Sequence, residues 1–292
     1  PDIEFEAIDI NPRHLGEFIW TGFDYLGEPT PYGGRDNSTN GYWNGHWPAR
    51  SSYFGAVDLA GFPKDRFYLY QSQWTKEPMV HLLPHWNWEG REEESIPVFV
   101  YTNAEEVELF LNGKSLGKKL KGKDKTPIPI NFIDWEGGRY KGDFLSPYRL
   151  MWKVPYQKGK LSVKAYDNSK LVAQAERITA GNPAKIRLIP DRSNIKANKD
   201  DLSFITVEVT DEQGNICPNA SNNIHFEVSG VGVIAAVGNG NAASTASFQS
   251  NQRKAFQGKC LLVIKSIDKS GKINIKASAK GLTSESLMIS AK

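Results

Sequence analysis

Residues 17–33 read EFIWTGFDYLGEPTPYG, and this stretch decides how the N-terminal part of the chain is interpreted. The run Phe18-Ile19-Trp20 has strand character and is too short to pack as a helix, so we predict one interior strand here. Gly27, Pro29 and Pro31 then exclude a regular element. An interior strand that runs directly into a polar loop is typical of the active-site face of α/β-barrel enzymes.

The side chains at this strand end are of the kinds that bind sugars. Trp20 and Tyr32 offer flat rings that can stack on the C–H face of a pyranose, and the carboxylates of Asp24 and Glu28 can accept hydrogen bonds from sugar hydroxyls. The alternative is that the aromatic strand is ordinary core. Residue types alone leave both interpretations open.

Four blocks of sequence resemble one known family. GEFIWTGFDYLGEPTPY at 16–32 and SSYFGAVDLAGFPKD at 51–65 resemble the last strand and last helix of the catalytic barrel of glycoside hydrolase family 2, the β-galactosidase and β-glucuronidase family. HLLPHWNW at 81–88 and VELFLNGKSLG at 107–117 are similar to the β-sandwich that follows the barrel in many of its bacterial β-galactosidases. The resemblance covers nearly the whole chain and is vaguest in the last third.

The resemblance implies a retaining enzyme whose two catalytic glutamates lie on earlier barrel strands. We therefore expect that this chain lacks both of them and is inactive as a separate polypeptide. Asp24 and Glu28 cannot replace them, because a retaining pair lies roughly 5–5.5 Å apart whereas four extended residues span up to about 13 Å. By the same resemblance, Trp20 would line the subsite for the terminal sugar. Asp24 and Glu28 would contact sugar hydroxyls or orient neighbouring groups, and a purely structural ion pair is an equal alternative.

Three domains are expected. Residues 1–78 would be the C-terminal segment of a catalytic (β/α)8 barrel, with helices over Pro1–Asp9 and Phe62–Trp74, because a complete barrel needs about 250 residues. Residues 79–181 and 182–292 would be two immunoglobulin-like β-sandwiches. The fold class is therefore mainly β, preceded by an incomplete barrel. Residues 32–52 are too long and irregular for a simple connection, which indicates a functional loop.

Alternating apolar residues predict the strands of the two sandwiches. Asn112-Gly113 marks a tight hairpin turn after the alternation Val107, Leu109, Leu111, and Asp167-Asn168 marks another turn. The predicted strands lie around 98–100, 107–111, 114–119, 148–154, 161–166 and 170–172 in the first sandwich, and at 185–188, 205–209, 224–228, 261–264, 273–277 and 287–289 in the second.

Composition excludes several classes of protein. The chain has 292 residues and a net charge of +3 with both signs interspersed, and without a basic-aromatic module nucleic-acid binding is not expected. No run approaches the ~20 apolar residues of a membrane span, and no signal sequence opens the chain. Location therefore follows from the resemblance, which favours the bacterial periplasm or cell surface. Cys217 and Cys260 are the only cysteines, and we expect two free thiols.

Two further groups of residues have ordinary explanations. His81, His85 and the nearby glutamates lack the spacing of a metal site, so no metal or other cofactor is expected. Tryptophans could form a sugar platform or pack between domains, and we expect packing at the domain boundary for Trp86 and Trp88. The five tryptophans concerned are Trp43, Trp47, Trp86, Trp88 and Trp135, of which Trp43, with His46, could reach the active-site mouth.

The sequence thus predicts the C-terminal portion of a retaining exo-β-glycosidase, a β-galactosidase, with the remainder of the parent barrel and a terminal β-linked sugar as partners. A β-glucuronide is the alternative substrate. Two alternatives from other classes stay open: a carbohydrate-binding module and a surface spacer built of immunoglobulin-like domains.

Overall fold

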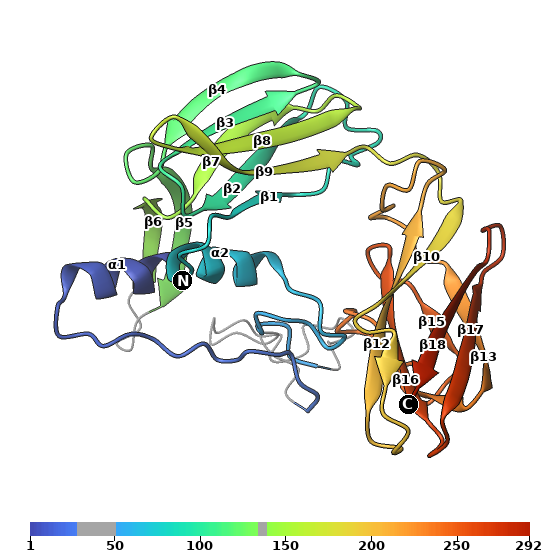
Figure 1. The fold of residues 1–292 in the computed structure, drawn as a ribbon. Coiled ribbons are helices and arrows are strands. Elements are labelled where there is room, and N and C mark those ends of the chain that lie inside the picture. Colours follow the sequence, from blue (N-terminus) through green and yellow to red (C-terminus); the bar gives the residue numbers. More distant parts are fainter. Residues whose placement is uncertain (28–50, 134–138) are drawn as a thin grey trace. The chain divides into compact units, whose positions relative to one another are not determined.

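The computed structural model describes residues 1–27, 51–133 and 139–292 (Figure 1). These residues form a mainly β structure with two helices and five sheets. They divide into two compact units. The first unit comprises residues 1–57 and 63–179, and the second comprises residues 58–62 and 180–292.

Both helices belong to the first unit and lie where the sequence predicts them. α1 spans Asp2–Ile10, and α2 spans Asp65–Trp74. α2 begins three residues later than predicted, with extended Lys64 as its N-cap and Asp65 in its first turn, where a negative charge complements the helix dipole. Pro63 therefore precedes the helix.

An ion pair fixes α1 to the strands beside it. The Asp2 carboxylate is buried and accepts hydrogen bonds from Ser146 Oγ at 2.6 Å and from Arg149 Nε at 2.8 Å, and it also contacts Arg149 Nη2. Phe5 of α1 packs edge-on against Tyr70 of α2 and Tyr148, with ring centroids 5.6 and 5.3 Å apart. These rings form a small core of their own.

Two sheets of the first unit share a separate, larger core. One has the order β1-β2-β7 and the other the order β4-β3-β8-β9. The strands are β1 Val80–Leu83, β2 Ser95–Thr102, β3 Glu106–Leu111, β4 Lys114–Leu120, β7 Leu150–Pro155, β8 Lys160–Asp167 and β9 Lys170–Ile178. Buried side chains alternate along them, as in Val98 and Val100 of β2 and Val107 and Leu109 of β3. We call these two layers the first sheet pair.

Local sequence signals in this pair are confirmed. Asn112 and Gly113 both have positive φ, 50° and 82°, and connect β3 to β4 as a tight hairpin. The later turn lies at Asn168 and Ser169, one residue beyond the predicted position. Trp86 is fully buried within the core, so its expected place at a domain boundary was wrong.

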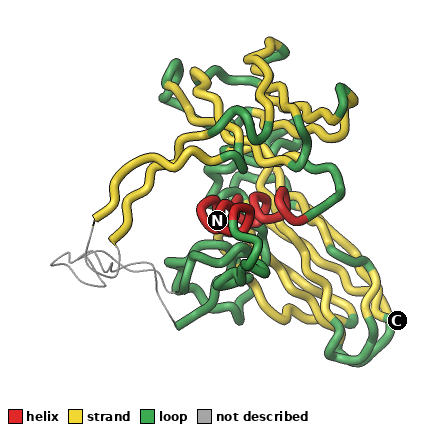
Figure 2. Tube along the Cα trace, turned by 90° about the vertical axis from the view of Figure 1, so that its left-hand side faces the viewer, coloured by secondary structure: helices red, strands yellow, loops and turns green. Residues whose placement is uncertain are grey.

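One hairpin of the first unit was not predicted. β5 (Thr126–Ile133) and β6 (Arg139–Ser146) pair only with each other, and the ribbon extends away from the sheet layers (Figure 2). β5 contains two prolines, Pro127 and Pro129. Proline is compatible with a strand whose second edge has no partner strand, because its missing N–H is not needed there.

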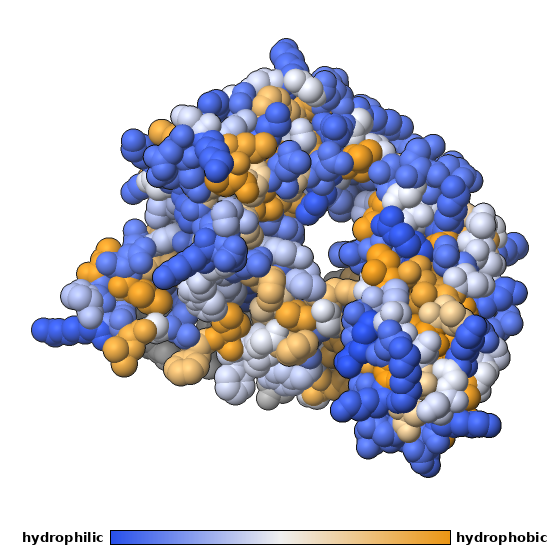
Figure 3. Space-filling model, in the orientation of Figure 1, coloured by the Kyte–Doolittle hydropathy of each residue, from blue (hydrophilic) through white to orange (hydrophobic). Residues whose placement is uncertain are grey.

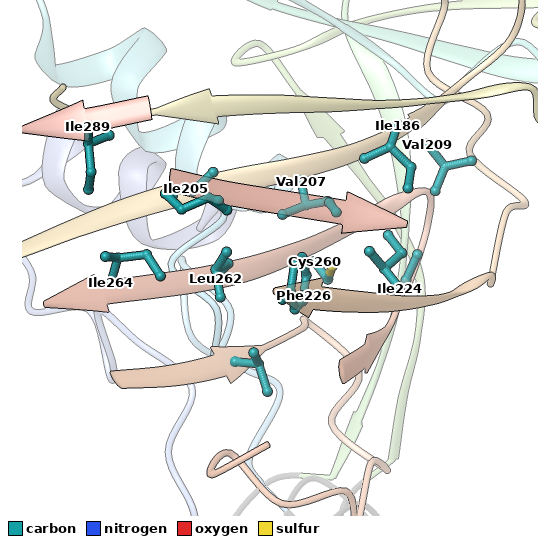
Figure 4. Close-up of a cluster of buried hydrophobic side chains, with 14 of the residues drawn as sticks. Ile186, Ile205, Val207, Val209, Ile224, Phe226, Cys260, Leu262, Ile264 and Ile289 are labelled. Atoms are coloured by element: carbon teal, nitrogen blue, oxygen red, sulfur yellow. The ribbon is translucent and has the colours of Figure 1, made fainter. Parts of the chain in front are cut away.

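The second unit also consists of two sheets, which we call the second sheet pair. Their orders are β10-β12-β16-β14 and β11-β18-β17-β13-β15. The strands are β10 Lys185–Pro190, β11 Asn194–Ile195, β12 Leu202–Thr210, β13 Asn223–Gly230, β14 Gly232–Gly238, β15 Gln252–Lys254, β16 Lys259–Ser266, β17 Gly271–Ser278 and β18 Glu285–Ala291. Buried Ile205 and Leu262 of one sheet and Ile224 and Ile289 of the other belong to one cluster (Figure 4).

Both cysteines are free and buried in this core, as expected. Burial raises the pKa of the Cys260 thiol to about 12, and burial together with the nearby Asp211 carboxylate raises that of Cys217 to about 11. We therefore expect neither thiol to react with a disulfide reagent at pH 8 in the folded chain, because the thiolate is the reactive form. Both should react once the chain is unfolded in guanidinium. Fast labelling of the native protein would contradict this.

Neither helix in the described residues has the length and apolar character that crossing a bilayer requires. On the surface, apolar side chains are exposed on α1 and on the segment that follows it (Figure 3). They include Ile3, Ile10, Leu15 and Phe18.

Candidate functional site

The predicted strand at Phe18–Trp20 is not formed. These residues make no strand pairing with the part of the chain that the structure describes, and the side chains of Phe18 and Trp20 are exposed, Trp20 by 76%. The prediction of a buried interior strand was therefore wrong for this chain. A strand needs hydrogen-bonding neighbours, and the described residues place none beside this segment.

The side chains of this segment nevertheless alternate as in a strand. Ile19 packs against the ring cluster of the two helices, while Phe18 and Trp20 on either side of it point away and are exposed. Glu17, two residues before Ile19, lies on the same side as Ile19. Its Oε1 is buried, and burial raises the pKa of its carboxyl, with the Glu4 carboxylate adding to the rise. One face of the segment therefore covers the helices and the other presents aromatic rings.

Backbone hydrogen bonds fix the residues that follow Trp20. Residues 21–24 lie parallel to residues 56–57, with a bridge between Phe23 and Val57. The bonds run from Ala56 N to Thr21 O at 3.1 Å, from Val57 N to Gly22 O at 2.9 Å and from Asp24 N to Val57 O at 2.9 Å. The peptide bond between Trp20 and Thr21 is cis. We call this pairing the strap.

Asp24 reinforces the strap with its side chain. The residue is 6% exposed, and its Oδ1 accepts hydrogen bonds from Gly55 N at 2.8 Å and from Lys64 Nζ at 2.8 Å. Lys64 Nζ also binds Oδ2 at 2.7 Å and donates to Tyr53 O at 2.9 Å. Both carboxylate oxygens of Asp24 thus have partners within the protein. This is the arrangement expected if Asp24 forms a structural ion pair.

Gly55 is required where the strap is tightest. A Cβ atom there would lie 2.4 Å from Asp24 N and 2.5 Å from the carbonyl carbon of Phe23. Backbone atoms cannot move aside as a flexible side chain can. Any larger residue would therefore push the two segments of the strap apart.

A second set of contacts continues the strap beyond Asp24. Ser52 N donates to Tyr25 O at 2.9 Å, Tyr25 N donates to Ser52 Oγ at 3.1 Å, and Leu26 forms a bridge with Ser51. These contacts bring together positions that are 25 or more residues apart in the sequence. The strap thus extends from Thr21 to Leu26.

A groove of about 360 Å³ opens beside Ile19. Its lining is largely apolar, from Ile19, Ala56, Phe67, Tyr70, Gln71, Trp74 and Thr75. Trp74 is half exposed although its ring packs on Tyr70 at 4.9 Å. An apolar surface of this size next to unpaired backbone is typical of a face that another protein segment covers.

Several predicted site residues lie outside the described residues. They are Glu28, Tyr32, Trp43, His46, Trp47 and Trp135.

The two histidines that suggested a metal site have protein partners. His81 stacks on Tyr68 with centroids 3.8 Å apart and binds Asp65 through Nε2 at 2.9 Å. Burial, with a contribution from Arg177, lowers the pKa of His85. Within residues 1–27, 51–133 and 139–292, no three His, Cys, Asp or Glu side chains group closely enough to hold a metal ion.

Sequence reasoning assigned no role to Lys64 and Gly55. Both fall inside the block at 51–65 that carried the family resemblance, but nothing local in that block indicates that Lys64 meets a carboxylate 40 positions earlier. The available signal was an acid directly after an apolar run, and its partner becomes visible only in the fold.

Comparisons with known proteins agree with the architecture. Residues 186–288 match Glycoside hydrolase family 2 C-terminal domain 5, and residues 93–173 match a domain of unknown function, DUF4982. The β-galactosidase BoGH2A of Bacteroides ovatus is 48% identical over 94% of this chain. A β-glucuronidase of Formosa agariphila is 28% identical over 60% of this chain.

A crystal structure of a β-glycosidase from Bacteroides vulgatus superposes on 98% of this chain with a TM-score of 0.80 and 34% identity. The chain spans only part of each of these proteins: 28% of BoGH2A, 16% of the Formosa enzyme and 32% of the B. vulgatus chain. With a family-specific C-terminal domain and close similarity along nearly its whole length, the chain belongs to glycoside hydrolase family 2 and is a C-terminal part of such a protein.

Proposed function

We propose that the full-length protein is a retaining exo-β-glycosidase that removes terminal β-galactosides, and that Trp20 forms one wall of its sugar subsite. The observation that supports this most directly is the exposed Trp20 ring, which directly precedes the strap that begins at Thr21. The 48% identity to a β-galactosidase favours galactose as the sugar. The similarity to a β-glucuronidase keeps β-glucuronides as the alternative.

In this proposal residues 1–78 are the last part of a (β/α)8 barrel. Three features support it. Ile19 packs against the ring cluster of the two helices, Phe18 and Trp20 on either side of it are exposed, and an apolar groove lies beside Ile19. A barrel strand has this arrangement, with helices outside and side chains pointing into the barrel on its other face. Neighbouring barrel segments of the parent would cover the groove.

Residues 79–181 and 182–292 are proposed to be immunoglobulin-like sandwiches. Each sheet pair consists of short antiparallel strands with alternating burial around one core, which is typical of such domains.

The proposed chemistry divides between this chain and the remainder of the enzyme. Two glutamates outside this chain would act as acid/base and nucleophile. Trp20 would pack against the apolar face of the ring and hold it while positive charge develops at the anomeric carbon. Asp24 would orient this wall through the strap, and Glu28 stays a candidate for contacts to sugar hydroxyls. Lys64 is neutralised by Asp24 and so is not offered to a substrate carboxylate.

Activity assays with the full-length protein test the proposal. We expect a much higher kcat/KM for nitrophenyl β-galactoside than for nitrophenyl β-glucuronide. NMR should show that the sugar released first has the β-configuration, as retention requires. The 292-residue chain alone should show no turnover. A higher kcat/KM for the β-glucuronide would show that the substrate is a glucuronide and not a galactoside. A first-formed sugar of α-configuration would contradict the retaining mechanism. Turnover by the 292-residue chain alone would contradict the proposal that both catalytic glutamates lie outside it.

A further inference from the structure

The two sheets of the first sheet pair differ in what lies on their outer faces. The ring cluster of α1 and α2 covers the outer face of β1-β2-β7, where it packs with Phe99 and Tyr101. The outer face of β4-β3-β8-β9 instead bears a hollow of about 390 Å³ over β8 and β9. A hollow of this volume is large enough for a small-molecule ligand.

Polar side chains from both strands line the hollow. Along β8 the core positions alternate with Ser162 and Lys164, whose side chains therefore point outward. On β9, Glu176 lies across from Ser162, and Gln174 lies across from Lys164. Within the described part of the chain, the side chains of Ser162, Lys164 and Gln174 form no hydrogen bond. Their donors and acceptors are thus available to a ligand.

An aromatic ring borders the hollow. Phe110 of β3 is partly exposed and lies directly across from Ser162, with Ser115 of β4 on its other side. Because both neighbours are short, they cannot cover the flanks of the ring. Lys164 Nζ lies 5.3 Å from the ring centre, within the range of a cation–π interaction. The ring therefore holds the ammonium group at the edge of the hollow.

The charges on this face balance one another. Lys160 lies 3.5 Å from the carboxylate of Glu176, and Lys118 lies 2.7 Å from that of Glu106. The third lysine, Lys164, lies across from a glutamate of β3. A face without surplus charge does not attract a polyanion, so its ligand is expected to be neutral and rich in hydrogen-bonding groups.

We propose that the outer face of β4-β3-β8-β9 binds a neutral oligosaccharide. One sugar unit lies in the hollow, with its C–H face against the exposed flank of the Phe110 ring and its hydroxyls hydrogen-bonded to Lys164 and Gln174. A pyranose matches this face because it presents an apolar side and a set of hydroxyls at once. The inference concerns binding and not cleavage, so it does not rest on the proposed function.

A second hollow supplies the matched control. It measures about 450 Å³ and lies on β13, β17 and β18, where Asn274 and Lys276 repeat the amide and ammonium groups of the first hollow. No aromatic residue is among the described residues that line it. If a ring is needed to bind the sugar, only the first hollow will do so.

Affinity electrophoresis of the 292-residue chain tests the proposal. In native gels we expect galactan or xylan, both neutral, to retard the chain, and polygalacturonate to leave its migration unchanged. The double variant Lys164→Ala/Gln174→Ala should bind the neutral glycan about tenfold more weakly, because it loses two hydrogen bonds. Both side chains are exposed, so the variant should fold normally. Phe110→Ala should bind about tenfold more weakly as well, and its tryptophan fluorescence in urea reports whether the first unit is folded.

Two further variants locate the binding surface. Asn274→Ala/Lys276→Ala makes the same two kinds of change at the second hollow and should leave retardation unchanged. Trp20→Ala should also leave it unchanged, which separates this surface from the proposed sugar subsite. Wild-type migration unaffected by both neutral glycans would overturn the inference, as would equal retardation by polygalacturonate or full retardation of Lys164→Ala/Gln174→Ala. A full-length protein that cleaves no β-glycoside would refute the proposed function and leave the electrophoresis result standing.

Discussion

Trp20→Ala in the full-length enzyme is expected to lower kcat/KM for a nitrophenyl β-galactoside about 30- to 100-fold, which corresponds to about 2–3 kcal/mol of lost transition-state stabilisation. The ring is 76% exposed in this chain, so its removal leaves no cavity in the described core. The loss should therefore reflect an interaction with substrate rather than folding. Steady-state kinetics with urea denaturation of the same samples separates the two effects.

The controls for Trp20 use the same kind of change at other places. Trp20→Phe keeps a flat apolar face and should retain most of the activity. Phe204→Ala removes another exposed ring, from β12 of the second sheet pair, and should leave kcat/KM unchanged. Wild-type kinetics in Trp20→Ala, or an equal loss in Phe204→Ala, would remove the proposed role of the indole.

Elements with local signals could be predicted from the sequence. The alternation Val107, Leu109, Leu111 followed by Asn112-Gly113 specifies a strand and its turn through contacts within a few residues, and β3 and β4 formed as expected. β14 was missed because its seven residues begin and end with glycine and contain an irregularity between Ile234 and Ala236, which disrupts the period of two.

The candidate site depends on contacts between residues that lie far apart in the sequence. The sequence at Phe18–Trp20 has the composition of an interior strand, but strand formation depends on neighbours that its own residues do not specify. Asp24 could be singled out as an acid at a strand end. Its partner, Lys64, lies 40 residues away, and Gly55 matters only because two backbones approach closely there. Long-range pairing of this kind cannot be read from residue types.

The second large effect is expected at the ion pair of the strap. Asp24 is 6% exposed and the Lys64 side chain 28%, so removing either partner leaves a poorly hydrated charge or donor behind. We expect Asp24→Asn and Lys64→Met each to lower the free energy of unfolding of the first unit by about 2–4 kcal/mol. All eight tryptophans precede residue 180, so tryptophan fluorescence in urea reports on the first unit alone.

A double-mutant cycle makes this prediction specific to the pair. If the cost of each single change arises from the orphaned partner, the variant with both Asp24→Asn and Lys64→Met should be destabilised by clearly less than the sum of the two. Lys160→Met, which removes the cation of an exposed pair with Glu176, should leave the transition unchanged. Strict additivity of the two strap variants would mean that the carboxylate and the ammonium stabilise the unit independently, through Gly55 N and Tyr53 O, and it would contradict the ion pair as the source of the effect.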